Sequence, residues 1–346
     1  MKWFRRFVEA AAVAYPLAIL AVAATLRYVG EAWWVSNVGL YLPPLGFALP
    51  LPFLAASLYV LRMRRLLWTQ SASLVVLLFA LMGFVPRWPA SAARGSGTLR
   101  VLSFNVNSGF GGAEALVDEI DGYAPDIVLL QETGGNEALG RLLRAHYPTV
   151  DATDQFILAT RFPLSSTLTP DKLPFNGRLR TPRFLRHVLE TSLGPIVVYN
   201  AHPLSPRVAL YGVRGRQGLG HEILSGALFR GDGSALLQDN SGLRSLQVQT
   251  LSEAAAKETD PVILAGDTNL PSLSPILHRY LSPFVDGFTQ TGWGFGYTFP
   301  TNKWLPWMRI DRILANNSLR FVRFEVGHTK TSDHFCVVAD LRLRDR

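Results

Sequence analysis

Two side chains suited to phosphate chemistry stand two residues apart after an apolar segment of this 346-residue chain. Residues 261–265, PVILA, are typical of a buried strand, and Asp267 and Asn269 follow in the tetrapeptide GDTN. A carboxylate such as Asp267 can bind a hard cation, and the Asn269 amide can donate to a phosphoryl oxygen without repelling it. The same pattern is also typical of a turn whose side chains bond to nearby backbone, so other residues must decide.

Further polar side chains recur at the ends of segments that read as strands. They are Asn105 and Asn107 after residues 99–104, Glu132 after 125–131, His202 after 195–201, Asp311 within RIDRIL, and Asp333 with His334 before 335–343. Strand ends lie at the rim of a sheet, where residues distant in the sequence can meet. The pattern therefore predicts one site that is built from several strand ends.

The elements that would position these residues alternate between strands and helices after residue 98. Strands are predicted at residues 99–106, 125–131, 186–192, 195–202, 261–266, 309–315 and 335–343, and helices at 113–122, 136–146 and 243–257. The short connections favour α/β layers with a mixed sheet or two packed sheets. Residues 207–241 are longer than a minimal connection and rich in glycine, which is typical of a disordered insertion or of a mobile loop over the site.

Six motifs in order, SFNVNS, LLQET, NAHPLSP, GDTN, MRIDRIL and TSDHF, resemble the endonuclease/exonuclease/phosphatase superfamily over residues 99–346. That superfamily includes DNase I-like nucleases, sphingomyelinases and inositol-polyphosphate phosphatases. The resemblance implies an α+β fold, a four-layer α/β/β/α sandwich of two mixed sheets with the site at one rim. It also implies a hydrolase that acts on a phosphoester or phosphoanhydride bond.

The resemblance also assigns a metal site. Glu132 would be the main ligand of Mg²⁺, or of Mn²⁺ in its place, with Asn105 nearby and Asp333 beside the metal or the catalytic dyad. Magnesium prefers one or two carboxylates and keeps several waters, so a sparse acidic shell is expected.

The remaining roles concern proton transfer and phosphate binding. His334 would be the general base for the attacking water, oriented by Asp311, because a carboxylate on one ring nitrogen fixes the tautomer. His202 would donate to the phosphate or the leaving oxygen, and Asp267 and Asn269 would complete the catalytic set. The expected substrate contacts are Asn107 and Arg186. Together these roles describe metal-assisted, in-line attack of water on phosphorus.

The first 86 residues have a different composition. Only Glu9 and Glu31 are acidic there, and three apolar stretches, residues 7–26, 38–61 and 66–85, approach the length that spans a bilayer. We therefore expect a membrane anchor with about three transmembrane helices at residues 1–86, a linker at 87–98 and the catalytic domain at 99–346. Four prolines lie in the second stretch, at positions 43, 44, 50 and 52, so that span is kinked or re-entrant.

Basic residues predict the orientation of these spans. Lys2, Arg5 and Arg6 precede the first span, and Arg62, Arg64 and Arg65 separate the second from the third. Because positive loops stay in the cytoplasm, the amino terminus should be inside and the catalytic domain outside a bacterial-type cytoplasmic membrane. Residues 1–97 hold nine Lys/Arg and two Asp/Glu, which leaves 25 and 24 for the remainder, so most of the net charge of +8 is a topology signal.

The substrate is less clearly indicated. Three spans ahead of such a domain resemble VanJ-type membrane proteins, and the aromatic loop at residues 292–308 favours a membrane interface, which points to a lipid-linked phosphate. An excess of basic residues between 172 and 230 instead favours an extracytoplasmic nuclease acting on DNA or RNA. A catalytically silent binding module is a third hypothesis. The expected partners are thus a lipid bilayer and a phosphate-containing substrate, with no obligate protein partner.

Overall fold

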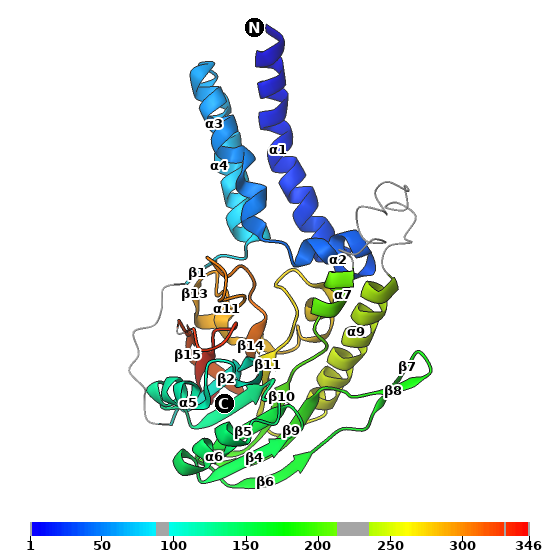
Figure 1. Ribbon diagram of the computed structural model, residues 1–346. Helices are drawn as coiled ribbons and strands as arrows, with labels where there is room; N and C mark the ends of the chain where they lie inside the picture. The colour runs from blue at the N-terminus through cyan, green and yellow to red at the C-terminus, as the bar shows by residue number, and fades with distance from the viewer. Residues whose placement is uncertain (1, 88–96, 213–234, 329, 345–346) are drawn as a thin grey trace.

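The computed structural model describes residues 2–87, 97–212, 235–328 and 330–344. Apolar helices from the first 86 residues project from one end of a layered domain (Figure 1). The candidate site lies close to where these helices meet the layered domain.

The layered domain contains two six-stranded mixed sheets. One, the β11 sheet, has the order β12 (Val285–Asp286), β14 (Asp311–Ala315), β11 (Val262–Asp267), β10 (Gly194–Ala201), β9 (Phe184–Thr191) and β6 (Leu164–Leu168). The other, the β2 sheet, has the order β15 (Leu319–Val326), β16 (Val337–Leu343), β2 (Leu99–Asn105), β3 (Ile127–Gln131), β5 (Phe156–Thr160) and β4 (Thr149–Thr153). Each sheet has one parallel pair, β10 with β11 and β2 with β3.

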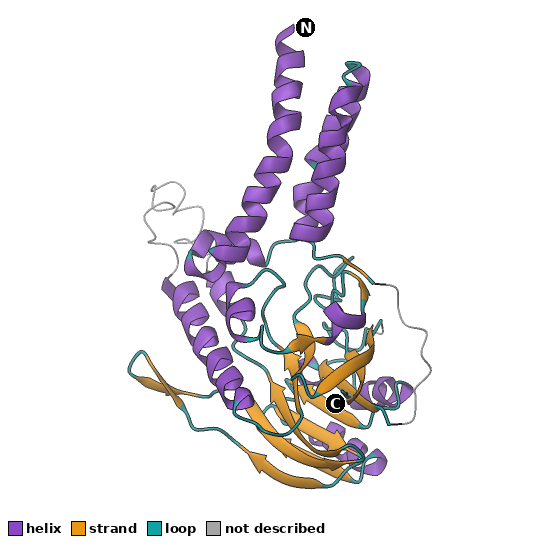
Figure 2. Ribbon diagram, turned by 180° about the vertical axis from the view of Figure 1, so that it is seen from behind, coloured by secondary structure: helices purple, strands orange, loops and turns teal. Residues whose placement is uncertain are grey.

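Alternating side chains on the strands build three separate cores. In β2, Val101 packs between the two sheets with Ile196 and Ile263, whereas its neighbour Leu102 packs outward. The outer face of the β2 sheet is covered by α5 (Ala113–Gly122) and α6 (Glu137–His146), and that of the β11 sheet by α9 (Ala235–Ala256) and α10 (Pro275–Tyr280). Figure 2 shows the helices outside the strands. This arrangement confirms the expected four-layer α/β/β/α sandwich.

Helices of the anchor segment, residues 2–86, are apolar on their outer surfaces. They are α1 (Lys2–Tyr28), α2 (Trp34–Leu40), α3 (Pro50–Val60) and α4 (Leu67–Val75), with η1 (Gly30–Ala32), η2 (Pro44–Ala48), η3 (Arg64–Leu66) and the π-helix η4 (Val76–Leu81). Two helices of the described residues, Lys2–Tyr28 and Arg64–Leu81, are long and apolar enough to cross a membrane, or three if a bent pair counts as one span. Leu17, Phe53 and Trp68 are exposed, as lipid-facing side chains would be.

The second expected span, residues 38–61, is not one continuous helix. It is broken between α2 and the η2–α3 segment, Pro44–Val60, with a bend of 94°. The prolines explain the break, since each lacks a backbone donor and clashes with the preceding turn. Instead of facing lipid, α2 packs on the layered domain: Trp34 lies against Ala209 and Leu237, and Asn37 Nδ2 donates to Ser241 Oγ at 2.6 Å.

Further contacts join the anchor segment to the layered domain. Ser274 Oγ donates to the buried Glu31 carboxylate, and Tyr297 donates through its hydroxyl to the Met82 carbonyl at 3.0 Å. Strand β1 (Val85–Pro86) pairs with β13 (Trp293–Gly294), and Phe84 packs edge-on against Trp293. The expected linker at residues 87–98 lies largely outside the described residues.

Most predicted elements of the layered domain occur close to their expected bounds, and α5 matches residues 113–122. Five strands of the two sheets were missed: β4, β5, β6, β12 and β15. Helix α9 begins eight residues before the predicted start at residue 243. Smaller elements are η5 (Asn107–Gly109), α7 (Arg207–Gly212), α11 (Gly287–Thr291) and the hairpin of β7 (Leu173–Phe175) with β8 (Arg178–Arg180). Most of the glycine-rich segment at 207–241 lies outside the described residues.

A buried ion network holds the start of β14 in place. Asp286 Oδ2 accepts from Arg309 Nη1 at 2.6 Å and from Arg312 Nη1 at 2.7 Å. Arg312, only 1% exposed, also donates to the carbonyl of Leu270, just after GDTN. Burial alone would raise the pKa of Asp286, but the two guanidinium groups outweigh it and lower that pKa to about 2.

The first prediction concerns this network. Asp286→Asn should lower the free energy of unfolding by about 3–5 kcal/mol, because it leaves a buried guanidinium without its counter-charge. Since the folded pKa of about 2 lies below the ordinary value of 3.8, the charged carboxylate stabilises the fold above about pH 4, and this contribution is lost as pH falls toward 2. Melting temperatures of detergent-solubilised protein between pH 7 and 2 measure both effects.

The matched control is Glu325→Gln, which removes the partner of Arg323 from a partly exposed pair. Such a pair contributes less than about 1 kcal/mol, so the control should melt close to wild type. Equal losses in both variants would contradict the special role of Asp286.

Candidate active site

Five of the six sequence motifs lie at strand ends of the two sheets, and these strand ends come together. The sixth motif, TSDHF, forms the loop before β16. In each parallel pair the two strands carry their carboxyl ends to the same edge, which brings Asn105 near Glu132 and His202 near Asp267. Asp311 stands directly opposite Asp267 in the antiparallel pairing of β14 with β11. The rim predicted from strand ends is therefore present, and both sheets contribute to it.

Unusual backbone geometry turns the chain at this rim. Gly266 has φ of +146°, and a Cβ there would lie 1.8 Å from the Ala201 carbonyl oxygen on β10, so only glycine fits. Glu132 and Asn269 both have φ of +52°, a conformation that is uncommon for residues other than glycine. Such conformations persist when surrounding contacts enforce them, and both residues lie just after a buried strand.

Asp267 lies at the centre of the cluster. Its Oδ2 accepts from Asn105 Nδ2 at 3.0 Å, across the gap between the two sheets. The same oxygen lies 3.6 Å from His202 Nε2 and 3.8 Å from His334 Nε2. Its Oδ1 accepts from the Asn269 backbone N–H at 2.8 Å, so the fourth residue of the GDTN motif is fixed by the second.

His334 forms the expected dyad with Asp311. Its Nδ1 lies 2.9 Å from Asp311 Oδ2, which places the proton on Nδ1 and leaves Nε2 directed toward Asp267. The preceding loop is fixed by Ser332, whose hydroxyl donates to the Asn105 carbonyl at 2.7 Å. Burial alone would lower the pKa of His334, but the carboxylates of Asp311 and Asp267 outweigh it and raise that pKa to about 9.

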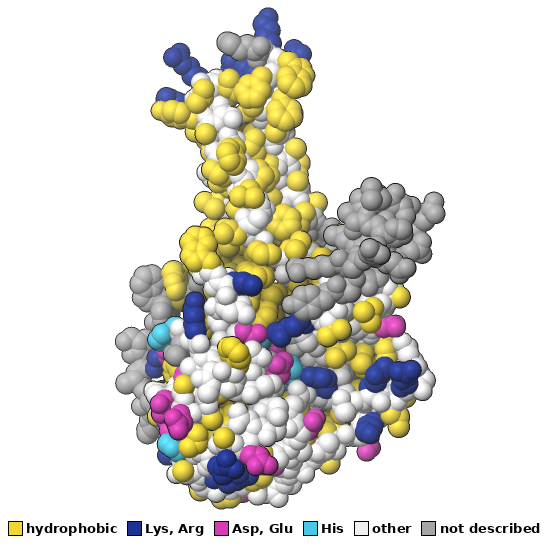
Figure 3. Space-filling model, viewed as in Figure 1, with side chains coloured by type: hydrophobic (Ala, Val, Ile, Leu, Met, Phe, Trp, Pro, Cys, Tyr) yellow, Lys and Arg dark blue, Asp and Glu magenta, His cyan; other side chains and the backbone are white. Residues whose placement is uncertain are grey.

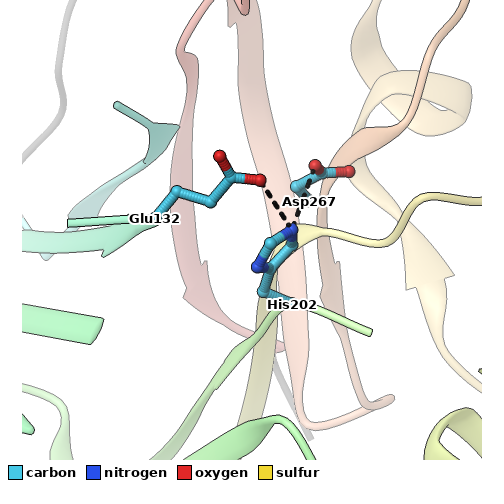
Figure 4. A group of neighbouring side chains, drawn as sticks. All are labelled: Glu132, His202 and Asp267. Carbon is cyan, nitrogen blue, oxygen red and sulfur yellow. Dashed lines mark ion pairs between the residues drawn. The ribbon is translucent and has the colours of Figure 1, made fainter. Parts of the chain in front are cut away.

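Two residues that the sequence analysis did not assign to the site, Gln155 and Arg183, fix the position of His202. Its Nδ1 lies 2.7 Å from Gln155 Oε1, and Arg183 donates through Nε to the His202 carbonyl at 2.8 Å. Its Nε2 therefore points at Glu132 Oε1, 3.3 Å away, and at Asp267 (Figure 4). The ring is 1% exposed and does not line the cavity, but its Nε2 contacts both carboxylates; its predicted contact with the phosphate stays a prediction.

Two overlapping groups of side chains could hold a cation. One comprises Glu132, His202 and Asp267, the other Asp267, Asp311 and His334, with ligand atoms within 4.8 Å of one another in each. Among the described residues, His202 Nε2 is buried and has no hydrogen-bond partner. Burial raises the pKa of Asp267; the nearby Asp311 carboxylate adds to this rise, and His334 opposes it. An unpartnered buried nitrogen beside one carboxylate that resists ionisation, Asp267, fits a bound divalent cation, which would favour the charged form of that carboxylate.

Glu132 is already held in its charged form. Burial alone would raise the pKa of Glu132, but His202 beside it, with Asn105 and His334, lowers that pKa to about 2. Asn105 serves here as a donor to the carboxylates, while its Oδ1 accepts from the Asn107 backbone N–H at 3.1 Å. The predicted metal residues Asn105 and Glu132 therefore do adjoin each other.

A cavity of about 410 Å³ opens over this cluster. Glu132, Asp267, Asn269 and His334 form its polar wall, and Phe299 covers the His334 ring at a centroid distance of 4.5 Å. Apolar side chains, among them Trp307, Met308 and Leu210, also line this cavity.

Tyr41, between α2 and η2, also lines this cavity and donates through its hydroxyl to the Asn269 carbonyl at 3.0 Å. The anchor segment thus contributes directly to the wall of the candidate site.

Two predicted site residues, Arg186 and Asn107, are placed differently, and a third, Asp333, lies beside the dyad as expected but has another partner. Arg186, expected to contact phosphate, lies on β9 and makes two hydrogen bonds to Glu258, at 2.6 and 2.9 Å, so its guanidinium is occupied outside the cavity. Asn107 contributes its backbone N–H, which orients Asn105, and does not line the cavity. Asp333 lines the cavity, but its carboxylate pairs with Arg207 at 3.1 Å and belongs to neither cation-binding group.

Three residues near the site were not predicted, because the sequence around each of them gives little indication of its contacts. Gln155 sits in the turn between β4 and β5, and nothing in its neighbours indicates a role. Arg183 was part of the basic excess at residues 172–230 but could not be assigned to His202. Tyr41 lies more than 220 positions from its partner Asn269, in a segment read as a membrane span.

Two mixed sheets between helical layers, with acids and histidines gathered at one rim, define the DNase I-like class of α+β folds. The family model described as the endonuclease/exonuclease/phosphatase family matches residues 102–334, so the chain belongs to that family of phosphoester-cleaving enzymes. A search of curated proteins finds no match.

Solved structures agree on the fold. An endonuclease/exonuclease/phosphatase from Beutenbergia cavernae has 19% identity and a TM-score of 0.50, covering 71% of this chain and 72% of its own. SmcL has 16% identity and a TM-score of 0.52, covering 72% and 100%. A humanized D. rerio TDP2 has 18% identity and a TM-score of 0.50, covering 71% and 100%.

The second prediction tests the cation-binding groups without relying on catalysis. Adding Mg²⁺ or Mn²⁺ should raise the melting temperature of the wild-type protein, because a ligand at 100 times its Kd stabilises the folded state by about 2.7 kcal/mol. Glu132→Gln should reduce this rise, since it removes a charged ligand, whereas Glu137→Gln, on an exposed side chain five positions on, should not. The same metal-induced rise in both variants would contradict a site at Glu132.

Proposed function

We propose that this protein is a membrane-anchored, Mg²⁺-dependent phosphoesterase that hydrolyses a lipid-linked phosphoester or phosphoanhydride at the outer face of a bacterial-type cytoplasmic membrane. The observation that carries the proposal is the shared cavity: its polar wall holds Glu132, Asp267 and His334, and its other wall includes Tyr41 of the anchor segment. A phosphate bound there would lie next to a membrane-embedded part of the same chain. The order of membrane spans followed by a catalytic domain resembles that of VanJ-type membrane proteins.

The geometry supports a separate catalytic role for each of these side chains. Asp311 holds the proton on Nδ1 of His334, so Nε2 is the atom that can accept a proton from the attacking water. Asp267 is one of the two carboxylates that raise the pKa of His334. A cation that offset the charge of Asp267 would lower that pKa and favour the neutral ring that a base needs. A divalent cation, when bound by Glu132 and Asp267, would polarise a phosphoryl oxygen and offset its charge.

Other residues would bind the phosphate group. Asn269 lines the cavity, and one hydrogen of its amide is used on the Pro203 carbonyl, at 3.1 Å, which leaves the other for a phosphoryl oxygen. Lys303 and Arg207 also line the cavity and bring positive charge to it. His202 would keep Glu132 and Asp267 in position for the cation.

The distribution of charge on the anchor segment supports the proposed orientation. Val8 packs with Leu58 and Met63, so the start of α1 and the turn between α3 and α4 lie at the same end. That end carries basic side chains and lies farthest from the layered domain (Figure 3). These residues are Lys2, Arg5, Arg6, Arg62, Arg64 and Arg65. If the basic end faces the cytoplasm, the catalytic domain lies on the opposite side.

The basic excess that favoured a nuclease is partly used inside the fold. Arg183 binds His202, Arg186 binds Glu258, and Arg207 pairs with Asp333. These guanidinium groups have protein partners and do not form an open collar for nucleic acid. A nuclease would instead be supported by cleavage of plasmid DNA or RNA that falls steeply with salt. The silent-module hypothesis is disfavoured because the dyad and the carboxylates are all in place.

The third prediction concerns catalysis. Glu132→Ala and His334→Ala should each abolish turnover, because one loses a metal ligand and the other the base, while the protein still inserts and folds. Purified variants are compared with wild type on undecaprenyl diphosphate, phospholipids, plasmid DNA and RNA, each with and without EDTA. Unchanged activity in either variant on the substrate that wild type cleaves would refute the assignment, and Glu137→Gln serves as the control.

The aromatic loop at residues 292–308 is divided between two roles. Trp307 donates through Nε1 to the Tyr41 carbonyl at 3.2 Å, and Trp293 packs on Phe84, so both dock on the anchor segment. Trp304 is 92% exposed and Leu305 is 55% exposed, next to the cavity residue Lys303. An exposed tryptophan beside the cavity suits contact with a membrane interface.

The fourth prediction follows from this division. Trp304→Ala should lower activity on substrate in a bilayer and leave activity on a soluble short-chain analogue unchanged, because only the membrane contact is lost. Trp307→Ala should lower both, since it lines the cavity and contacts Tyr41. Equal losses on the two substrates for Trp304→Ala would contradict a role at the membrane surface.

A further inference from the structure

A second hollow lies next to the catalytic cavity, between the anchor segment and the layered domain. It is a narrow slot of about 40 Å³, and the residues around it are mostly apolar. Leu26 of α1, Leu40 of α2, Phe47 of η2 and Leu81 of η4 line it from the anchor side, and Leu273 lines it from the layered domain. None of the catalytic side chains reaches this slot.

The slot and the catalytic cavity share a wall. Trp307 and Met308 line both, and Tyr41, which lines the cavity, stands in sequence between the slot residues Leu40 and Leu42. The hydrogen bond from Trp307 Nε1 to the Tyr41 carbonyl, 3.2 Å long, holds this partition together. The catalytic cavity, with its polar wall, and the mostly apolar slot therefore adjoin at this partition, and anchor residues such as Leu26 and Leu81 line the slot.

We propose that this slot is a binding site for the hydrocarbon chain of an amphiphilic substrate. The phosphate would lie at Glu132, Asp267 and His334, and one slim chain would pass Trp307 and enter the slot between η2 and η4. An apolar hollow of this kind excludes water and favours hydrocarbon. Its narrowness selects a single chain, and its position directs the rest of that chain into the bilayer beside α1 and η4. The proposal rests on the proposed function only in assigning phosphate to the head of the ligand.

The anchor segment then has two tasks, retention at the membrane and selection of the substrate. Leu42 can test the second task, because it lines the slot at its edge and is 50% exposed, so a change there disturbs no buried core. Leu45, three positions on, is similarly exposed at 55% but does not line the slot, which makes it a matched control.

The fifth prediction uses n-alkyl phosphates of two to ten carbons as probes. Their binding to full-length protein in nanodiscs, with Mg²⁺ present, is measured by calorimetry and corrected with empty nanodiscs. For wild type and Leu45→Gln, affinity should rise about fourfold for each methylene group that enters the slot, and then level off because the slot is short. For Leu42→Gln the rise should be reduced over the first few carbons, while ethyl phosphate binds as in wild type.

If affinity rises equally with each added carbon in wild type, Leu42→Gln and Leu45→Gln, the chain-binding site is refuted, since the chain would then only partition into lipid. This outcome is separate from failure of the proposed function, because binding of the probes does not require hydrolysis. A chain-length slope that depends on Leu42, in a protein that hydrolyses no phosphoester, would keep the site and reject the enzyme.

Discussion

Two carboxylates, Asp267 and Asp311, face each other on neighbouring antiparallel strands at the rim of the β11 sheet. Like charges in directly opposed positions destabilise a sheet, and burial adds to that penalty. The surrounding structure supplies the compensation: the ring of His334 lies between them, 2.9 Å from one and 3.8 Å from the other, and Asn105 donates to Asp267 from the second sheet. The repulsion that remains would favour a bound cation, and the two carboxylates raise the pKa of His334 to about 9 against the effect of its burial.

The same constraint explains why both sheets are needed. Asp267 alone could be placed by β11, but its partners come from β2, β14 and the loop before β16. The close pairing of β10 with β11, which requires Gly266, brings His202 to the same oxygen. The sandwich is therefore the means by which five separate segments converge around one carboxylate, with the Nε2 atoms of His202 and His334 at 3.6 and 3.8 Å from it.

The anchor segment extends this convergence beyond the layered domain. Tyr41 donates to the Asn269 carbonyl and Glu31 accepts from Ser274, so the end of the GDTN motif and the loop that follows it are both held by the anchor segment. These contacts are polar and buried or partly buried, which sets them apart from a tether with no contact to the site. The geometry of the site therefore depends in part on the apolar helices of the first 86 residues.

Local patterns in the sequence were enough to predict the candidate site residues, the central strands of each sheet and the apolar helices of the first 86 residues. The alternation in β15 could also have been recognised, whereas β4 and β6 are too polar for that. The contacts of Arg186 with Glu258, of Gln155 with His202 and of Tyr41 with Asn269 came to light with the folded structure. Those outcomes depend on which side chains become neighbours when distant segments pack, and no local pattern records that.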